Sequence, residues 1–293
     1  MEGLAMNVIP EIGLRRILKE FRWRVGLTWL LVFLEYALDA AIPLLIGLAI
    51  DDMLSGGSTQ LAWLVCAFVL ITAIAVLRRF YDTRAYSKIR VKLGSELDQR
   101  QQALSVSIRN ARLQMATELV DFIEKDTPEL FAAVITLVAS AMILSSFSMD
   151  LAMSSLGLLV AMLTIYLCFH QRFFRLNGGL NSQMERQVSI LSARQPGQLL
   201  KHLHAIRHWQ VRLSDAESIV YGLIFLLITA FVVLNLWLCS GYVGITTGAL
   251  FSIVTYSWQF GDAAVSLPTT LQSWSRLHEI TIRLNNPEAH GAA

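Results

Sequence analysis

Three acidic residues lie inside long apolar stretches of the sequence, where an ionised side chain is costly: Glu35, Asp39 and Asp262. Carboxylates in such places usually face the interior of a helix bundle or a water-filled path. On a helix, Glu35, Asp39 and Thr28 share one face, because they are four and seven residues apart. Two neighbouring carboxylates favour the retention of one proton, which suits proton exchange. The alternative is a place near the outer interface, or structural hydrogen bonding.

Polar residues also recur at steps of three and four along the last apolar stretch, so a helix places them in one stripe. In lipid such a stripe must turn toward water or another polar helix. We predict that it lines a path for substrate. The alternative is hydrogen bonding between helices, in which Ser and Thr act as packing residues. The predicted substrate or proton pathway consists of Glu35, Asp39, Ser252, Thr255, Gln259, Asp262, Ser266 and Thr269.

The sequence holds little that indicates other chemistry. It has no G-x-x-x-x-G-K-[ST] motif, so we expect no ATP-binding residues. No spacing indicates a nucleophile and its base, so we expect no catalytic residue. His202, His204 and His208 lie among basic residues, which is more typical of a helix near anionic headgroups than of a metal site. We therefore predict no metal and no cofactor in this chain.

The composition is that of a membrane protein. Of the 293 residues, 55% are apolar and only 16% are charged, against about 25% charged in soluble domains. A helix that spans a bilayer needs about 20 mostly apolar residues, and no strand-like alternation is present. The sequence therefore predicts an all-α polytopic membrane protein with six transmembrane helices. The stretches are 25–50, 61–81, 129–147, 151–170, 219–240 and 248–271.

The basic residues predict the orientation. All 24 Lys and Arg lie before the first stretch, between the fourth and fifth, after the sixth, or in the segment between the second and third that begins with Arg78 and Arg79 at the end of the second stretch. The opposite loops, near 51–60, 148–150 and 241–247, hold none. Cytoplasmic loops carry the excess of Lys and Arg. We therefore predict a multi-pass protein of the inner (plasma) membrane with both termini in the cytoplasm.

The two long basic stretches predict helical hairpins that project from the membrane by about 35–40 Å. Apolar residues recur there at helical spacing. We expect breaks near Asn110 and at Gln195-Pro196-Gly197, and a helix start at Asp126 or Thr127. The expected organisation is an amphipathic segment at 1–24, a membrane domain at 25–284 with inner hairpins at about 82–128 and 171–218, and a tail at 285–293.

This topology resembles the membrane domain of ABC exporters of the six-helix, type I exporter kind. Pro43-Leu-Leu-Ile-Gly47 followed by Ile50-Asp51 is similar to the end of that family's first helix. Thr117-Glu118-Leu119 followed by Asp126-Thr127 resembles its "GEL…D" stretch, and Gly244 to Leu250 resembles the opening of its sixth helix. The resemblance covers roughly residues 10–285. It implies a helix-swapped dimer, a sixth helix that lines the path, and hairpin tips that dock on nucleotide-binding domains.

The sequence departs from that family by lacking the nucleotide-binding motifs. Leu54-Ser-Gly-Gly-Ser58 matches the ABC signature by letters only, and we interpret it as a Gly/Ser turn in an outer loop. The second hairpin is shorter than usual after its break, so docking through the first is favoured. The resemblance implies a transport subunit for an unidentified solute, with ATP supplied only through a partner.

Three functions stay open on the sequence. The first is alternating-access transport driven by a separate nucleotide-binding subunit that docks on the hairpins. The second is an ATPase-independent, proton-coupled transporter with the same fold, and the third is a non-transporting scaffold or regulator. The expected partners are a second copy (a homodimer) or a related six-helix chain, and the lipid bilayer. No nucleic acid is expected.

Overall fold

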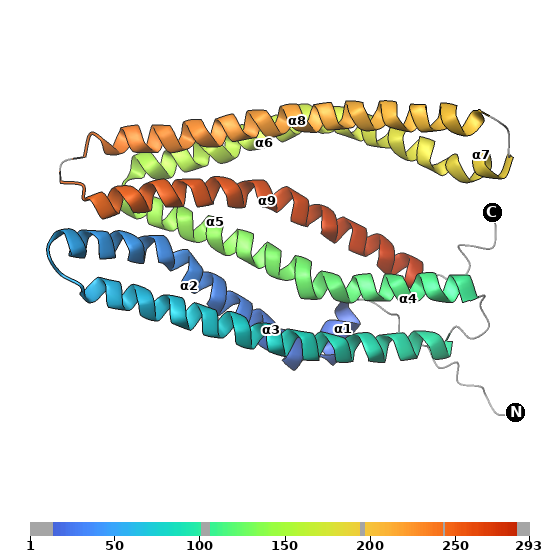
Figure 1. The fold of residues 1–293 in the computed structure, drawn as a ribbon, viewed down its shortest axis with the longest axis horizontal. Helices are drawn as coiled ribbons and strands as arrows, with labels where there is room; N and C mark the ends of the chain where they lie inside the picture. The colour runs from blue at the N-terminus through green and yellow to red at the C-terminus, as the bar shows by residue number, and fades with distance from the viewer. Residues whose placement is uncertain (1–13, 101–105, 194–196, 243, 286–293) are drawn as a thin grey trace, which may run out of the picture. The chain divides into compact units, whose positions relative to one another are not determined.

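The computed structural model describes residues 14–100, 106–193, 197–242 and 244–285 (Figure 1). These residues form helices and turns, with no strand among them. The elements are α1 (Leu14–Glu20), α2 (Arg22–Leu54), α3 (Thr59–Arg100), α4 (Val106–Asp121), the π-helix η1 (Phe122–Asp126), α5 (Thr127–Phe147), α6 (Met149–Glu185), α7 (Gln187–Ala193), α8 (Gln198–Cys239) and α9 (Thr247–Asn285).

Five helical stretches of the described chain are long and apolar enough to cross a membrane. They are Arg22–Leu54, Thr59–Gln99, Arg112–Phe147, Met149–Met184 and Gln198–Cys239. They contain the first five predicted stretches, so the all-α membrane architecture is confirmed. The sixth predicted stretch, 248–271, lies on α9, which is long but is not among the five because polar residues interrupt its apolar sequence.

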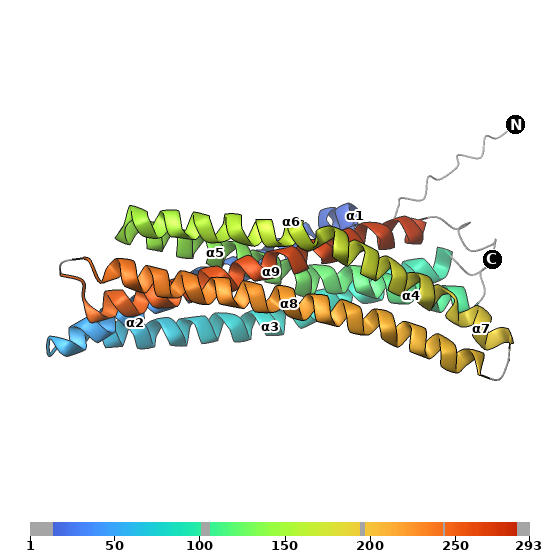
Figure 2. The same cartoon turned by 90° about the horizontal axis from the view of Figure 1, so that it is seen from above.

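The chain divides into two compact units, which we describe separately. Unit 1 runs to Ile143 and resumes at Ile245. In it α2 packs along α3 and α9, α4 packs on α3, and both α4 and η1 contact α9. Unit 2 runs from Leu144 to Gly244, and its main contact is the antiparallel pair α6 and α8 (Figure 2).

The first predicted hairpin is built differently from the expectation. The predicted break near Asn110 is wrong, because Asn110 lies inside α4. The predicted helix start at Asp126 or Thr127 is confirmed in position, because α5 begins at Thr127, but the chain does not leave the helix before it, because α4, η1 and α5 follow one another without a gap. The reason is the π turn: the Thr127 N–H bonds to the Phe122 carbonyl, five residues back. Such a turn holds one extra residue, and it ends just before Pro128, which has no N–H to donate.

In unit 2 the predicted break is confirmed at Gly197, which has a φ of 80° and directly precedes α8. Positive φ is readily adopted by glycine alone. Residues 195 and 196 of the predicted break lie outside the described residues. Between α5 and α6 the turn is the single residue Ser148, whose Oγ accepts from the Leu151 N–H at 3.3 Å and so caps α6.

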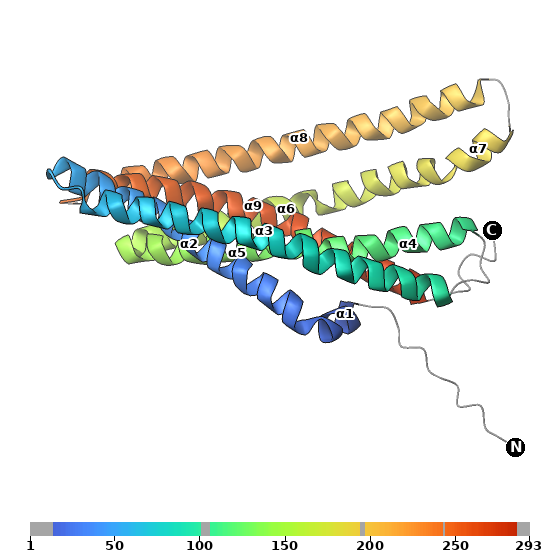
Figure 3. The ribbon, with the colours of Figure 1, turned by 60° about the horizontal axis from the view of Figure 1, so that its bottom comes forward.

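Glycine and serine also form the turn between α2 and α3, as predicted. Gly56 has a φ of 86°, and the Gly57 N–H donates to the Asp52 carbonyl at 2.8 Å. The Asp52 carboxylate then accepts from the Gln60 N–H at 3.0 Å, at the start of α3. At the other end of α2, the short helix α1 joins it at an angle through Phe21 (Figure 3).

Candidate functional site

The first half of α9 is joined to the second half of α2 through a tyrosine hydroxyl. The Tyr256 hydroxyl donates to the Ala40 carbonyl at 2.7 Å and accepts from the Leu44 N–H at 3.2 Å. In a regular helix those two backbone groups would bond to each other, so the hydroxyl is inserted into the hydrogen-bond ladder of α2. The insertion lies beside Pro43, which already interrupts the ladder.

Small residues then let the two backbones touch. The Ser252 hydroxyl donates to the Pro43 carbonyl at 3.0 Å. Gly47 and Gly248 face each other so closely that a Cβ on either residue would overlap the carbonyl of the other. Close approach at small residues is the usual means by which helices pack in lipid, where apolar surface gives little drive to associate.

An aspartate at the end of α2 caps the start of α9. Asp51 accepts from the Gly248 N–H at 2.8 Å through Oδ1 and from the Thr246 hydroxyl at 2.6 Å through Oδ2. A carboxylate is stabilised at a helix N-terminus by the free N–H groups and the helix dipole. We call the whole contact, Ala40–Asp51 against Thr246–Tyr256, the α2–α9 seam. It joins two of the segments that carry the family resemblance.

The predicted polar stripe of α9 is divided among different environments. Ser252 is buried in the seam. The Thr255 and Ser266 hydroxyls donate to carbonyls of their own helix, at 2.8 and 3.0 Å. Gln259 is half-buried and its Oε1 has no partner among the described residues. Asp262 is exposed. The Thr269 side chain lies outside the described residues, and lining of a path by this helix stays a prediction.

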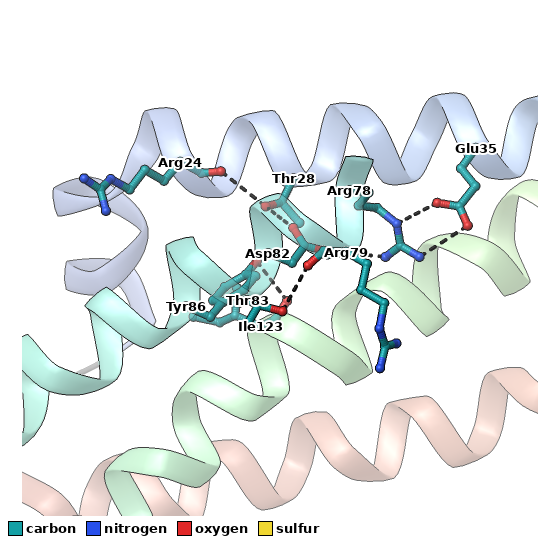
Figure 4. Close-up of polar contacts among 9 residues, drawn as sticks. All are labelled: Arg24, Thr28, Glu35, Arg78, Arg79, Asp82, Thr83, Tyr86 and Ile123. Carbon is teal, nitrogen blue, oxygen red and sulfur yellow. Dashed lines mark hydrogen bonds and ion pairs between the residues drawn. The ribbon is translucent and has the colours of Figure 1, made fainter. Parts of the chain in front are cut away.

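A second polar site, which we call the Arg78 cluster, joins α2 to α3 (Figure 4). It consists of Thr28, Glu35, Arg78 and Asp82. Arg78 Nε lies 2.6 Å from Glu35 Oε2 and a second guanidinium nitrogen lies 3.3 Å from Oε1, so the pair is bidentate. Asp82 Oδ2 is 3.7 Å from the guanidinium, and Asp82 Oδ1 is 2.8 Å from the Thr28 hydroxyl.

The structure therefore changes the predicted carboxylate pair. Glu35 and Thr28 do belong to one site, but Asp39 is exposed and Asp82 takes its place. The sequence analysis missed Arg78 and Asp82. A signal for them exists, because Arg78, Asp82, Tyr86 and Arg90 follow one another at steps of four along α3 and so share a face.

That same face of α3 continues to the π turn. The Tyr86 hydroxyl is buried and donates to the Ile123 carbonyl at 3.4 Å. Further along, Arg90 pairs with both Asp121 and Glu124, which flank the start of η1. Burial raises the pKa of Asp121, but hydrogen bonds from Arg90 and Lys125 outweigh that effect, so its pKa lies below the ordinary value.

These contacts belong to a larger part of unit 1 that we call the arm. The arm consists of α1, α3 beyond Asp82, α4 and η1. It has a hydrophobic core of buried side chains. Ion pairs cross its surface between Arg16 and Glu96, Lys92 and Glu20, and Arg109 and Asp98. The core residues are Ile17, Tyr86, Ile89, Leu93, Leu97, Ala116, Leu119, Val120, Phe122 and Ile123, and Val25 of α2 packs with them.

Unit 2 has its own polar and small-residue contacts between α6 and α8. The Ser154 hydroxyl lies 2.5 Å from the side-chain oxygen of the buried Asn235. Nearer the hairpin tip, the Trp209 ring fills the space that a Cβ at Gly179 would take. His202 is buried there, and its Nε2 has no hydrogen-bond partner among the described residues. In the described part of the chain, no three His, Cys, Asp or Glu residues are grouped to hold a metal ion.

Comparison with known proteins identifies the family to which this chain belongs. A family model, the ABC transporter transmembrane region, matches residues 14–248. A search of curated proteins finds no match. The matched range includes α1 to α8 and the first residues of α9, and thus the arm, the Arg78 cluster and the contacts between α6 and α8 in unit 2. Together with the five membrane-length helices, the match shows that this chain belongs to the ABC transporter transmembrane region family and is an integral membrane transport subunit of the ABC type.

Proposed function

We propose that this chain moves an unidentified solute by alternating access, and that ATP hydrolysis on a separate nucleotide-binding chain drives the movement. The family implies association with a nucleotide-binding subunit. The observation that carries the proposal is the arm. A helical hairpin that only connects two spans does not need a continuous buried core or ion pairs between its helices. A hairpin that transmits force must resist bending, and these contacts make it stiff.

The bracing of the arm supports this role in detail. Arg90 holds Asp121 and Glu124 at the π turn, and Tyr86 holds the Ile123 carbonyl one turn away. Because α4, η1 and α5 are continuous, a displacement of α4 passes directly into the membrane-length part of α5. The arm also contacts α9 through α4 and η1, the helix that we predict to line the solute path.

The predicted path would be completed by a second copy or a related chain. On α9 the side chains of Phe251, Trp258 and Asp262 are exposed in the single chain, while the opposite face is buried against α2 and the arm. An exposed face that mixes aromatic, apolar and acidic groups suits an amphipathic solute. A homodimer would bring two such faces together, in keeping with the symmetry of most oligomers.

The proton-coupled alternative is weakened by the Arg78 cluster. A coupling carboxylate must bind and release a proton in the transport cycle. Glu35 instead forms a bidentate ion pair with Arg78, which occupies both of its carboxylate oxygens. Asp39 and Asp262 are exposed and would have to serve that role without Glu35.

Co-reconstitution tests the proposal. The purified chain is placed in liposomes with a stand-alone ABC-type ATPase from the same genome, and phosphate release is measured with and without this chain. We expect the chain to stimulate hydrolysis, and Arg90→Ala to reduce the stimulation because the arm then bends at the π turn. Asp215→Asn, an exposed position in unit 2, is the control and should match the wild type.

A second set of liposomes holds this chain alone, with Hoechst 33342 as a cationic amphipathic probe and an imposed proton gradient. Under the proposal no gradient-driven dye movement occurs. Dye movement that needs the gradient and disappears in Glu35→Gln, together with no effect on any ATPase chain, would overturn the proposal in favour of proton coupling.

A further inference from the structure

The Arg78 cluster has more negative than positive charge, in a place where water is scarce. The charged groups that act on Asp82 are Arg78 on its own helix, Glu35 on α2 and Glu124 on η1. The side chain of Asp82 is only 10% exposed, and those of Glu35 and Arg78 are 14% and 20% exposed. One partly buried guanidinium therefore faces a partly buried carboxylate, Glu35, and a buried one, Asp82, and an uncompensated charge in such a place is costly.

The geometry shows which carboxylate Arg78 neutralises. Glu35 receives two nitrogens of the guanidinium, at 2.6 and 3.3 Å, which is the strong bidentate arrangement. Asp82 is 3.7 Å from the nearest guanidinium nitrogen, beyond hydrogen-bond distance. The positive charge is thus used by Glu35, and Asp82 is left without a counter-charge of its own. Glu124 adds repulsion and is itself held by Arg90.

The hydrogen-bond partners of Thr28 indicate the same outcome. A threonine hydroxyl has one proton to donate. The Thr28 hydroxyl lies 3.3 Å from the Arg24 carbonyl and 2.8 Å from Asp82 Oδ1, so two acceptors compete for its single proton. The Tyr86 hydroxyl already donates to the Ile123 carbonyl. These groups offer more hydrogen-bond acceptors than donors. An ionised Asp82 adds one more acceptor, whereas a protonated Asp82 supplies the missing donor.

We propose that Asp82 is a proton-binding site, protonated at neutral pH, whose carboxylic acid donates to the Thr28 hydroxyl while Glu35 and Arg78 form the neighbouring ion pair. Thr28 can then donate to the Arg24 carbonyl, and Tyr86 to the Ile123 carbonyl of the π turn. The proton leaves the whole cluster neutral, and its loss would place an unpaired charge between α2, α3 and η1. The site is independent of what drives transport, so it stands or fails separately from the proposed function.

Infrared spectroscopy of the intact protein in dodecyl maltoside, a detergent without ester groups, tests the site, because a protonated carboxylic acid then gives an isolated carbonyl stretching band. We expect the wild type to show that band at neutral pH and to lose it on alkalinisation. Asp82→Asn should lack it at neutral and alkaline pH while keeping the melting temperature, because the amide is neutral and can still donate to Thr28. Asp215→Asn, at an exposed position, should keep the band.

The variant Glu35→Gln tests the proposal more sharply. Without the Glu35 charge, Arg78 is free to pair with Asp82, so Asp82 should ionise and the neutral-pH band should disappear although Asp82 is intact. A role in packing alone would not move the band in this variant. A band in Asp82→Asn equal to that of the wild type, or an undiminished band in Glu35→Gln, would overturn the proposal.

Discussion

The two polar sites of unit 1 share helix α2 but hold it by different means. In the α2–α9 seam, hydroxyls and one terminal carboxylate bond to backbone groups, and glycines bring the backbones into contact. In the Arg78 cluster, side chains bond to side chains: Arg78 to Glu35 in an ion pair, and Thr28 to Asp82. A backbone group without a partner is costly in lipid, so the interrupted ladder at Pro43 needs neutral donors close by.

The comparison also shows where α2 changes partner. Glu35 is held by α3, and Ala40, one and a half turns later, is held by α9. Directly after this change of partner, Pro43 removes one backbone hydrogen bond of α2, and the Tyr256 hydroxyl replaces the next one, between Ala40 and Leu44. We infer that α2 bends there, with its two parts following different neighbours. Substitutions in the seam should therefore destabilise the protein by steric overlap. Substitutions of the charged residues should destabilise it by the loss of electrostatic attraction, which water screens.

The largest effect is expected from Gly47→Ala. The added Cβ would overlap the Gly248 carbonyl, which is backbone and cannot rotate away. We expect a loss of about 3 kcal/mol in the free energy of unfolding, at the upper end for overpacking, seen as a lower melting temperature in detergent. Gly26→Ala in the same helix is the control: nothing lies within 4 Å of its added Cβ, so helix propensity should make it neutral or stabilising. Equal effects of the two changes would contradict the backbone contact.

A smaller effect is expected from Tyr256→Phe, which keeps the ring and removes the hydroxyl. The Ala40 carbonyl and the Leu44 N–H lose their shared partner, and direct bonding between them recovers part of the loss. We expect about 1 kcal/mol of destabilisation. Hydrogen–deuterium exchange over α2 measures a second effect. The Leu44 amide should exchange more slowly, because it then bonds directly to the Ala40 carbonyl. Faster exchange there would show that the hydroxyl is the only partner available to that amide.

The smallest effect is expected from Arg90→Gln in the arm. Its partners Asp121 and Glu124 are partly exposed, so screening keeps the loss below about 1 kcal/mol. Because Arg90 contributes to lowering the pKa of Asp121 in the folded protein, this stability is present above the unfolded-state pKa and is lost as the pH falls through the folded-state value. Melting curves of wild type and variant should differ at neutral pH and converge in acid. A difference that persists in acid would point to packing by the Arg90 stem.

Much of the architecture could be predicted from the sequence, because apolar length and charge placement are local. All six predicted stretches lie on long helices, and the break at Gly197 was found because Pro and Gly mark it directly. The π turn could not be found in this way. The sequence Asp126-Thr127-Pro128 is typical of a helix start, and only the contacts of Tyr86 and Arg90 with the neighbouring helix favour continuing through it.

The sites were less accessible to prediction, because they depend on which helices meet. Spacing alone placed Glu35 with Asp39, since both lie on one helix, whereas the charge that holds Glu35 is 43 residues further along the chain. Ser252 and Thr255 looked alike in the polar stripe, yet one bonds across the seam and the other to its own helix. The four-residue repeat from Arg78 to Arg90 was the available signal for the cluster.

The cap that Asp51 places on α9 also has a consequence for the making of the protein. Its two partners lie 195 and 197 residues later in the chain. During synthesis α2 is therefore complete long before the N–H groups that its carboxylate serves have been made. Contacts so distant in sequence form late, so closure of the seam is among the last steps of assembly in the bilayer. Until then the carboxylate and the interrupted ladder of α2 must be satisfied by water, lipid headgroups or the insertion machinery.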